Sequence, residues 1–293
     1  MKTAATPRPG AQPTRARLRP SGPLWPAWRR QRAALLTGGA LVLVLAGYIV
    51  YQRTGMVALI RDRNLTGCRL WYPECHGRRL SSDDGRPTPL GRAFADLDAY
   101  RSALLHTGRL LLAIPAIIGT SIGAPLVARE IESGTAKLVW SQSAGRTRWL
   151  LATLALPAAA TLAATTLLAA LFTWWWWPVR GMVFEEVSWV TAVPFEVAGP
   201  APVAFALLSL VLGTAFGLLL RRTVPAMACT LALTVGSIYG LRQMRPHLMP
   251  PLTTTANPGS HFWPMQWIQA GICLGAAALL AAFCLWWIRH RRP

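Results

Sequence analysis

The fold is decided by residues 110–177, which read LLLAIPAIIGTSIGAPLVA, then REIESGTAKLVWSQSAGRTR, then WLLATLALPAAATLAATTLLAALFTWWWW. The first and third parts contain no Asp, Glu, Lys, Arg or His, and each is long enough to cross a membrane, which takes roughly 20 helical residues. The middle part, residues 129–148, is polar and cationic. We therefore interpret the stretch as two membrane helices joined by a short surface loop, and we call residues 129–148 the polar loop.

Uncharged runs of this kind recur along the chain. Hydrophobic residues make up 53% of the 293 residues and charged residues only 14%, whereas soluble domains carry about 25% charged residues. The sequence therefore predicts an all-α integral membrane protein with one membrane domain over residues 33–288. Its six predicted transmembrane helices are residues 33–51, 110–128, 149–177, 197–220, 223–241 and 267–288.

Basic residues near the ends of these runs predict the orientation, because short loops rich in Lys and Arg stay in the cytoplasm. The polar loop has four basic residues against two acidic ones, and Arg221 and Arg222 join the fourth and fifth runs. We therefore expect the polar loop and both termini to be cytoplasmic. The predicted outer loop, residues 52–109, is basic as well, but a loop this long escapes much of the rule.

Two further features concern the outer side. Thr88-Pro89 is a typical helix start, and Leu97 and Leu104 follow at helical spacing, which predicts an amphipathic helix that leads into the second crossing. The third run ends in four consecutive Trp residues, 174–177, which we interpret as a belt at the membrane interface.

The outer loop also contains two cysteines. Cys68 and Cys75 lie outside the cytoplasm in this topology, where disulfides form, so we expect a bond between them. The alternatives are free thiols or a metal site completed by His76, but that site lacks a fourth ligand. We therefore predict no metal.

The two ends of the chain are basic. Residues 1–32 contain eight Lys or Arg, six Pro and no acidic residue, a composition that cannot build a core and is attracted to anionic lipid. Within this predicted cytoplasmic tail, Trp25 and Trp28 with their Arg neighbours indicate an interfacial segment. Residues 289–293 form a second basic tail, also expected in the cytoplasm.

The order of residues inside the polar loop suggests a docking element. Gly134 makes a break, and Thr135 is able to cap a short helix over residues 136–142, on which Trp140 would face another surface. The alternative is an ordinary cationic loop whose Trp140 lies in the lipid interface. The pattern alone leaves both open.

The motif itself resembles the loop between the second and third membrane helices of ABC-2 type transporter permeases, especially the branch common in high-GC Gram-positive bacteria. The positions that carry the resemblance are Arg129, Glu130, Glu132, Gly134, Thr135, Arg146 and Arg148. Many relatives have a Pro within 143–145 and a Lys soon after the last Arg, and this chain has neither.

The resemblance implies a fold and a set of partners. In that family the loop forms a coupling helix that rests on a separate ABC ATP-binding subunit, and an elbow helix precedes the first crossing. Two permeases, as a homodimer or a heterodimer, assemble with the ATP-binding subunits in the bacterial plasma membrane. Trp140 would lie on the coupling helix.

Four of the runs contain Gly-x-x-x-Gly, a spacing that places both glycines on one helix face and lets helix backbones approach closely. Packing within one subunit and contacts in a dimer are both compatible with it. The pairs are Gly119 with Gly123, Gly213 with Gly217, Gly236 with Gly240, and Gly271 with Gly275.

Several function classes are excluded by what the sequence lacks. It has no phosphate-binding Gly-x-x-x-x-Gly-Lys-Ser/Thr loop, no metalloprotease or serine hydrolase motif, and no charged residue within the six runs that would serve a proton- or sodium-driven transporter. The net charge of +19 lies at membrane flanks, which argues against nucleic-acid binding. We expect no cofactor and no enzymatic activity in this chain. The prediction is an exporter permease for a hydrophobic or amphipathic substrate, and the alternative is a membrane scaffold or sensor.

Overall fold

The computed structural model describes residues 24–63, 65, 86, 88–134, 145–180, 192–248 and 262–290. Within these residues the chain is helical and contains no strand. Six of its helices are long and apolar enough to cross a membrane, which confirms the all-α integral membrane fold with six spans. These spans are Gln31–Asp62, Gly91–Glu132, Thr147–Val179, Ala201–Leu220, Thr223–Met244 and Phe262–His290.

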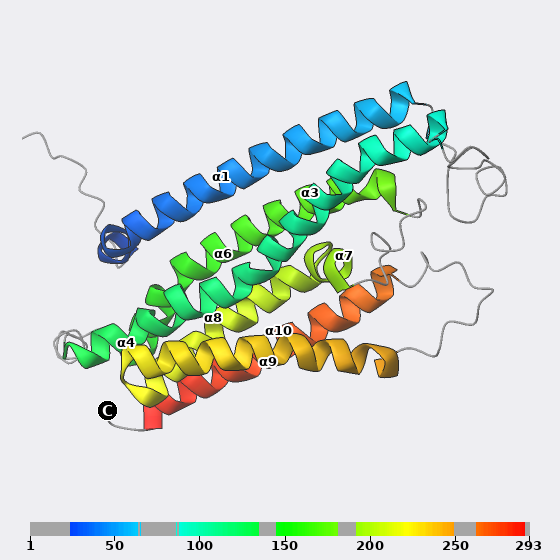
Figure 1. Cartoon of the computed structure of the whole chain (residues 1–293). Helices are drawn as coiled ribbons and strands as arrows, with labels where there is room; N and C mark the ends of the chain where they lie inside the picture. The colour runs from blue at the N-terminus through cyan, green and yellow to red at the C-terminus, as the bar shows by residue number, and fades with distance from the viewer. Residues whose placement is uncertain are drawn as a thin grey trace, which may run out of the picture.

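The long helices lie side by side, with α8 at the centre (Figure 1). Helix α8 packs against α3, η1, α4, α6, α9 and α10, whereas α1 packs mainly on α6. The elements are α1 (Leu24–Asp62), α3 (Pro89–Ile118), the π-helical turn η1 (Gly119–Gly123), α4 (Ala124–Glu132), α6 (Arg146–Trp176), the 3₁₀ turn η2 (Trp177–Val179), α7 (Ala192–Val197), α8 (Ala201–Leu220), α9 (Thr223–Leu248) and α10 (Phe262–His290).

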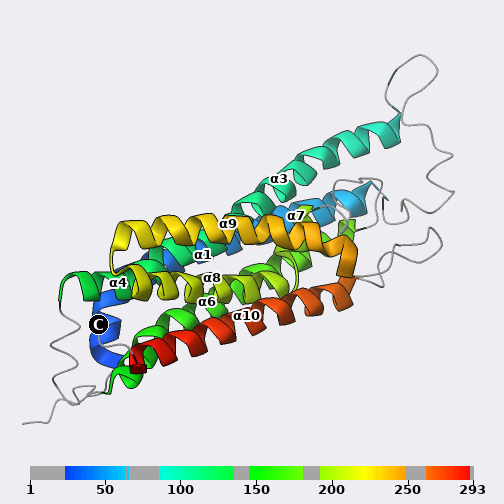
Figure 2. The ribbon, with the colours of Figure 1, turned by 90° about the horizontal axis from the view of Figure 1, so that it is seen from below.

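The bundle has two ends, the loop end and the far end. At the loop end, α4 stops at Glu132, α6 starts at Arg146, and α8 turns into α9 (Figures 1 and 2). The far end holds the junction of α7 with α8 and the starts of α3 and α10. The first turns of α1 run at a marked angle to the rest of that helix.

The helices extend beyond the uncharged runs and into the predicted outer segment 52–109, which agrees with the helix start predicted at Thr88-Pro89. Helix α1 continues to Asp62, and α3 starts at Pro89, where the Gly91 backbone N–H donates to the Thr88 hydroxyl at 3.1 Å. Charged residues are tolerated because they lie on the outward faces, as in the ion pair between Arg63 and Asp96 at 3.0 Å. Leu97 and Leu104, predicted on the apolar face of α3, are buried.

The four consecutive Trp residues separate into two pairs. Trp174 and Trp177 are 42% and 41% exposed, as a belt requires, but Trp175 and Trp176 are buried in the core of the far end. The prediction of a four-residue belt is therefore wrong for the central pair. Successive residues on a helix point about 100° apart, so four in a row cannot share one face.

Some predictions concern residues outside the described ranges. They include the disulfide between Cys68 and Cys75, the short helix 136–142 with Thr135 and Trp140, and the tail before residue 24. These stay predictions.

Candidate functional site

Four of the eight motif glycines lie at one contact between α8 and the π turn η1 with the start of α4. A Cβ added to Gly213 would overlap the Gly119 carbonyl oxygen and lie 2.7 Å from the Ala124 nitrogen. A Cβ on Gly123 would lie 2.5 Å from the Leu210 carbonyl oxygen, and one on Gly217 would lie 2.7 Å from the Ala124 oxygen. The two backbones thus approach to distances that only glycine permits.

The other four motif glycines have open surroundings. A Cβ built at Gly236, Gly240, Gly271 or Gly275 meets no atom within 4 Å among the residues that the structure describes. These glycines lie on α9 and α10, whose faces at these positions contact no other helix that the structure describes.

The two arms of the polar loop, the end of α4 and the start of α6, pack into one apolar cluster at the loop end. The cluster joins them to α8 and α10, and Arg289 of α10 also donates from Nε to the Thr147 hydroxyl of α6 at 3.2 Å. Both arms therefore contact the same two helices, α8 and α10. The buried members are Val127, Trp149, Leu150, Ala215, Leu218, Cys284 and Ile288.

A second link connects the α4 arm to α9. The Glu132 carboxylate accepts two hydrogen bonds from Thr223, from its backbone N–H at 3.1 Å and from its hydroxyl at 2.7 Å. Thr223 is the first residue of α9, where backbone N–H groups have no partner within the helix and negative charge is favoured. Glu132 therefore caps a helix that begins 91 positions further along the chain.

Gly134 ends the α4 arm in the left-handed conformation, with φ of +73°. The Ser133 and Gly134 N–H groups donate back to the carbonyls of Arg129 and Ile131, at 3.0 and 3.1 Å, which closes the helix terminus. A Cβ at Gly134 would meet no atom of the described residues within 4 Å, so among these residues the backbone conformation, not a lack of space, favours glycine.

Substitution of Gly134 tests this conformational requirement. We expect Gly134→Ala to lower the free energy of unfolding by about 1 kcal/mol, because Cβ is disfavoured in the left-handed region. Gly134→Asn is the matched control and should cost less, since Asn enters this region more readily. Thermal unfolding in detergent measures both variants, and equal losses would contradict the interpretation.

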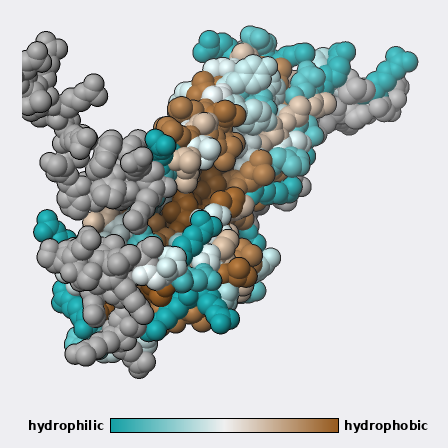
Figure 3. Space-filling view, turned by 90° about the vertical axis from the view of Figure 1, so that its left-hand side faces the viewer, coloured by the Kyte–Doolittle hydropathy of each residue, from teal (hydrophilic) through white to brown (hydrophobic). Residues whose placement is uncertain are grey.

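Three other predicted residues border an open groove. Arg129, Glu130 and Arg148 line its loop end, between α1 and the helices α4 and α6. Figure 3 shows the loop-end side of the molecule, where a hollow of apolar surface is bordered by hydrophilic residues. Arg146, also predicted, is the first residue of α6, and only its backbone is described.

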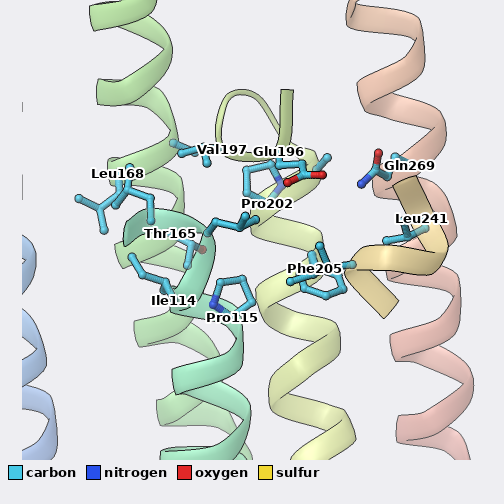
Figure 4. A pocket seen from close by; sticks show the side chains of 15 residues that line it. Ile114, Pro115, Thr165, Leu168, Glu196, Val197, Pro202, Phe205, Leu241 and Gln269 are labelled. Carbon is cyan, nitrogen blue, oxygen red and sulfur yellow. The ribbon is translucent and has the colours of Figure 1, made fainter. Parts of the chain in front are cut away.

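A cavity of about 50 Å³ near the far end, lined mainly by apolar residues with Glu196 and Gln269 among them, was not predicted. Figure 4 shows Glu196 of α7 and Gln269 of α10 at its border, among apolar residues such as Phe205. The Glu196 carboxylate, 5% exposed, receives two hydrogen bonds from Arg242 of α9, at 2.5 and 2.6 Å. Gln269 Oε1 is buried and has no hydrogen-bond partner within the described residues, and the cavity beside it is large enough for a water molecule.

Sequence reasoning missed this pair because both residues adjoin uncharged runs without being inside them. Glu196 directly precedes the fourth run and Arg242 directly follows the fifth. Buried Gln266 adds to the same junction: its Nε2 donates to the Phe195 carbonyl at 2.6 Å and its Oε1 accepts from the Ala201 N–H at 3.1 Å. The available signal was that two consecutive runs, 197–220 and 223–241, are flanked by residues of opposite charge at the ends away from the turn that joins them.

Comparison with protein families identifies the chain. A family model described as "ABC-2 membrane transporter related" matches residues 39–245, which is more than two thirds of the sequence. The chain belongs to this family. Searches of curated proteins and of solved structures found no match.

The ABC-2 match covers most of the geometry described above. It includes both arms of the polar loop, the glycine contact with α8, and both Glu196 and Arg242. Together with the six spans, it makes the chain a multi-pass membrane protein of a transporter permease family. Such permeases are transport components that work with an ATP-binding subunit.

Proposed function

We propose that the chain is the permease subunit of a bacterial ABC exporter, inserted in the plasma membrane with both termini and the polar loop in the cytoplasm. A separate ABC ATP-binding subunit docks on the polar loop and supplies the energy. The observation that carries this proposal is that both arms of the loop are joined to the rest of the bundle, through the apolar cluster and through the bonds from Glu132 to Thr223.

The proposed mechanism is mechanical. Closure of the ATP-binding subunits displaces the short helix 136–142, with Thr135 and Trp140, and so pushes on Arg129–Gly134 and on Arg146–Arg148. Motion of α4 passes to α9 through Glu132 and to α8 through the glycine contact. Motion of α6 passes to α8 and α10 through the shared cluster. Packed cores resist gradual deformation, so the helices shift as units between two arrangements.

The remaining parts of the proposal concern substrate and assembly. The apolar walls of the groove suit a hydrophobic or amphipathic substrate such as a drug, lipid or peptide. A second permease, identical or related, completes the transporter. The faces of α9 and α10 that carry the Gly236–Gly240 and Gly271–Gly275 pairs offer surfaces on which it could pack. This chain performs no catalysis and holds no cofactor.

Replacing Glu132 separates docking from energy coupling. We expect Glu132→Ala to lower ATP-driven transport by at least about fivefold, the lower range of coupling between distant sites, because α9 loses its connection to α4. The ATP-binding subunit should still co-purify. Glu132→Gln keeps an oxygen acceptor for Thr223 and should retain most activity. Transport by Glu132→Ala at the wild-type rate would contradict the proposed path.

Docking is tested by co-purification from the native membrane, with the bound chain identified by its ATP hydrolysis and peptide masses. We expect an ABC ATP-binding subunit to be retained when Met1–Gly22 is deleted and lost in Glu130→Ala/Gly134→Leu. A membrane scaffold or sensor, the alternative function, would show the reverse dependence. Reporter fusions that place the polar loop outside the cell would overturn the proposed orientation.

A further inference from the structure

A long apolar groove runs along the bundle between α1 and the helices α3, α4 and α6. Its volume is about 1480 Å³. Leu41 and Leu43 on the α1 side are 60% and 69% exposed, and Leu110 on the α3 side is 64% exposed. Because these residues lie within helices that are long and apolar enough to cross a membrane, the groove opens to the bilayer.

The groove ends in charged groups at the loop end. Arg129 from the last turn of α4 and Arg148 from the first turn of α6 line it there, together with Glu130 and Gln31. Neither arginine forms an ion pair within the part of the chain that the structure describes. Residues 135–144, which connect the two arms, contain no Asp or Glu. Two arginines against one glutamate leave this end of the groove positive.

We propose that the groove binds an anionic glycerophospholipid of the surrounding bilayer. Its phosphate lies between the Arg129 and Arg148 guanidinium groups, which bind phosphate through charge-assisted and often bidentate hydrogen bonds. Basic pockets between membrane helices at the bilayer surface select anionic headgroups in this way. The acyl chains follow the apolar walls past Gly38 and Gly39 of α1.

The charge distribution favours a lipid over a protein helix as the occupant. An apolar helix from a second copy would cover the walls but would leave both arginines without anions. A bilayer phospholipid satisfies both ends at once, and it is in large excess next to the exposed walls. Lipid binding in this groove requires only the membrane location and the groove itself, and it does not depend on the proposed transport function.

The test measures binding of phosphatidylglycerol to the purified full-length chain in detergent by native mass spectrometry, with phosphatidylcholine for comparison. We expect Arg129→Gln/Arg148→Gln to weaken phosphatidylglycerol binding about tenfold, as loss of charge-assisted contacts predicts, and to remove its advantage over phosphatidylcholine. Gly38→Leu/Gly39→Leu fills the groove and should weaken binding of both lipids.

Matched controls keep the test falsifiable. Arg221→Gln/Arg222→Gln removes the same charge from the loop end without touching the groove, and Gly47→Leu adds a leucine side chain on α1 outside it. A Cβ at Gly38, Gly39 or Gly47 meets no described atom within 4 Å, and Leu is the better helix former, so these variants should fold.

Two results would overturn the proposal. One is phosphatidylglycerol binding that is unchanged in both groove variants, or reduced equally in the controls. The other is a change from dimer to monomer in Gly38→Leu/Gly39→Leu without any change in lipid binding, which would make the groove a protein interface. Neither result bears on transport, which this assay does not measure.

Discussion

Replacement of Arg242 by Met is expected to destabilise the protein by about 3 kcal/mol, because it leaves a buried carboxylate without its partner. The Glu196 side chain is 5% exposed and receives two short hydrogen bonds from Arg242. Arg242 itself is 31% exposed, so the pair is only partly removed from water and the value lies at the lower end for a broken buried pair. Unfolding in detergent, followed by helix content, measures the loss.

The double variant Glu196→Gln/Arg242→Met is the control for this prediction. It removes the charge that the single variant leaves uncompensated, so most of the lost stability should return. Glu196→Gln alone should cost only about 1 kcal/mol, since a neutral amide is still able to accept a hydrogen bond from Arg242. If both single variants and the double variant lost the same stability, the ion pair would not be what holds α7 to α9.

Gly213→Ala is expected to cost about 2 to 3 kcal/mol, the upper range for overpacking in a tight core. The added Cβ would overlap the carbonyl oxygen of Gly119 and would come within 2.7 Å of the Ala124 nitrogen. Both are backbone atoms on a neighbouring helix, so relief requires α8 to move away from η1 and α4. The same variant should lower transport, because the proposed path runs through this contact.

Gly236→Ala on α9 is the matched control. It makes the same substitution in the same sequence motif, but its Cβ meets no atom within 4 Å in the part of the chain that the structure describes. Since Ala is the better helix former, we expect no loss and a gain of up to about 1 kcal/mol. Thermal unfolding of the two variants side by side gives the difference. Similar stabilities would contradict the close contact between α8 and α4.

The candidate site was readable from the sequence only in part. The motif placed Glu132 and Gly134 in the polar loop, and both have defined structural roles at the end of α4. The partner of Glu132 was not readable, because Thr223 lies 91 positions away and resembles any threonine after a basic turn. Similarly, Gly213 and Gly236 share one motif, yet only the first lies against another backbone.

The sequence by itself determined the class of the protein, the number of spans and, through the polar loop, the transporter family. The physical reason is that uncharged runs of about 20 residues have essentially one solution in a bilayer, a helix that satisfies its own backbone hydrogen bonds. Tertiary structure alone decided that α8 is central, which glycines touch, and that Glu196 meets Arg242. Lipid is as apolar as the helices, so composition does not reveal which faces meet, and close packing with a few polar contacts makes that choice.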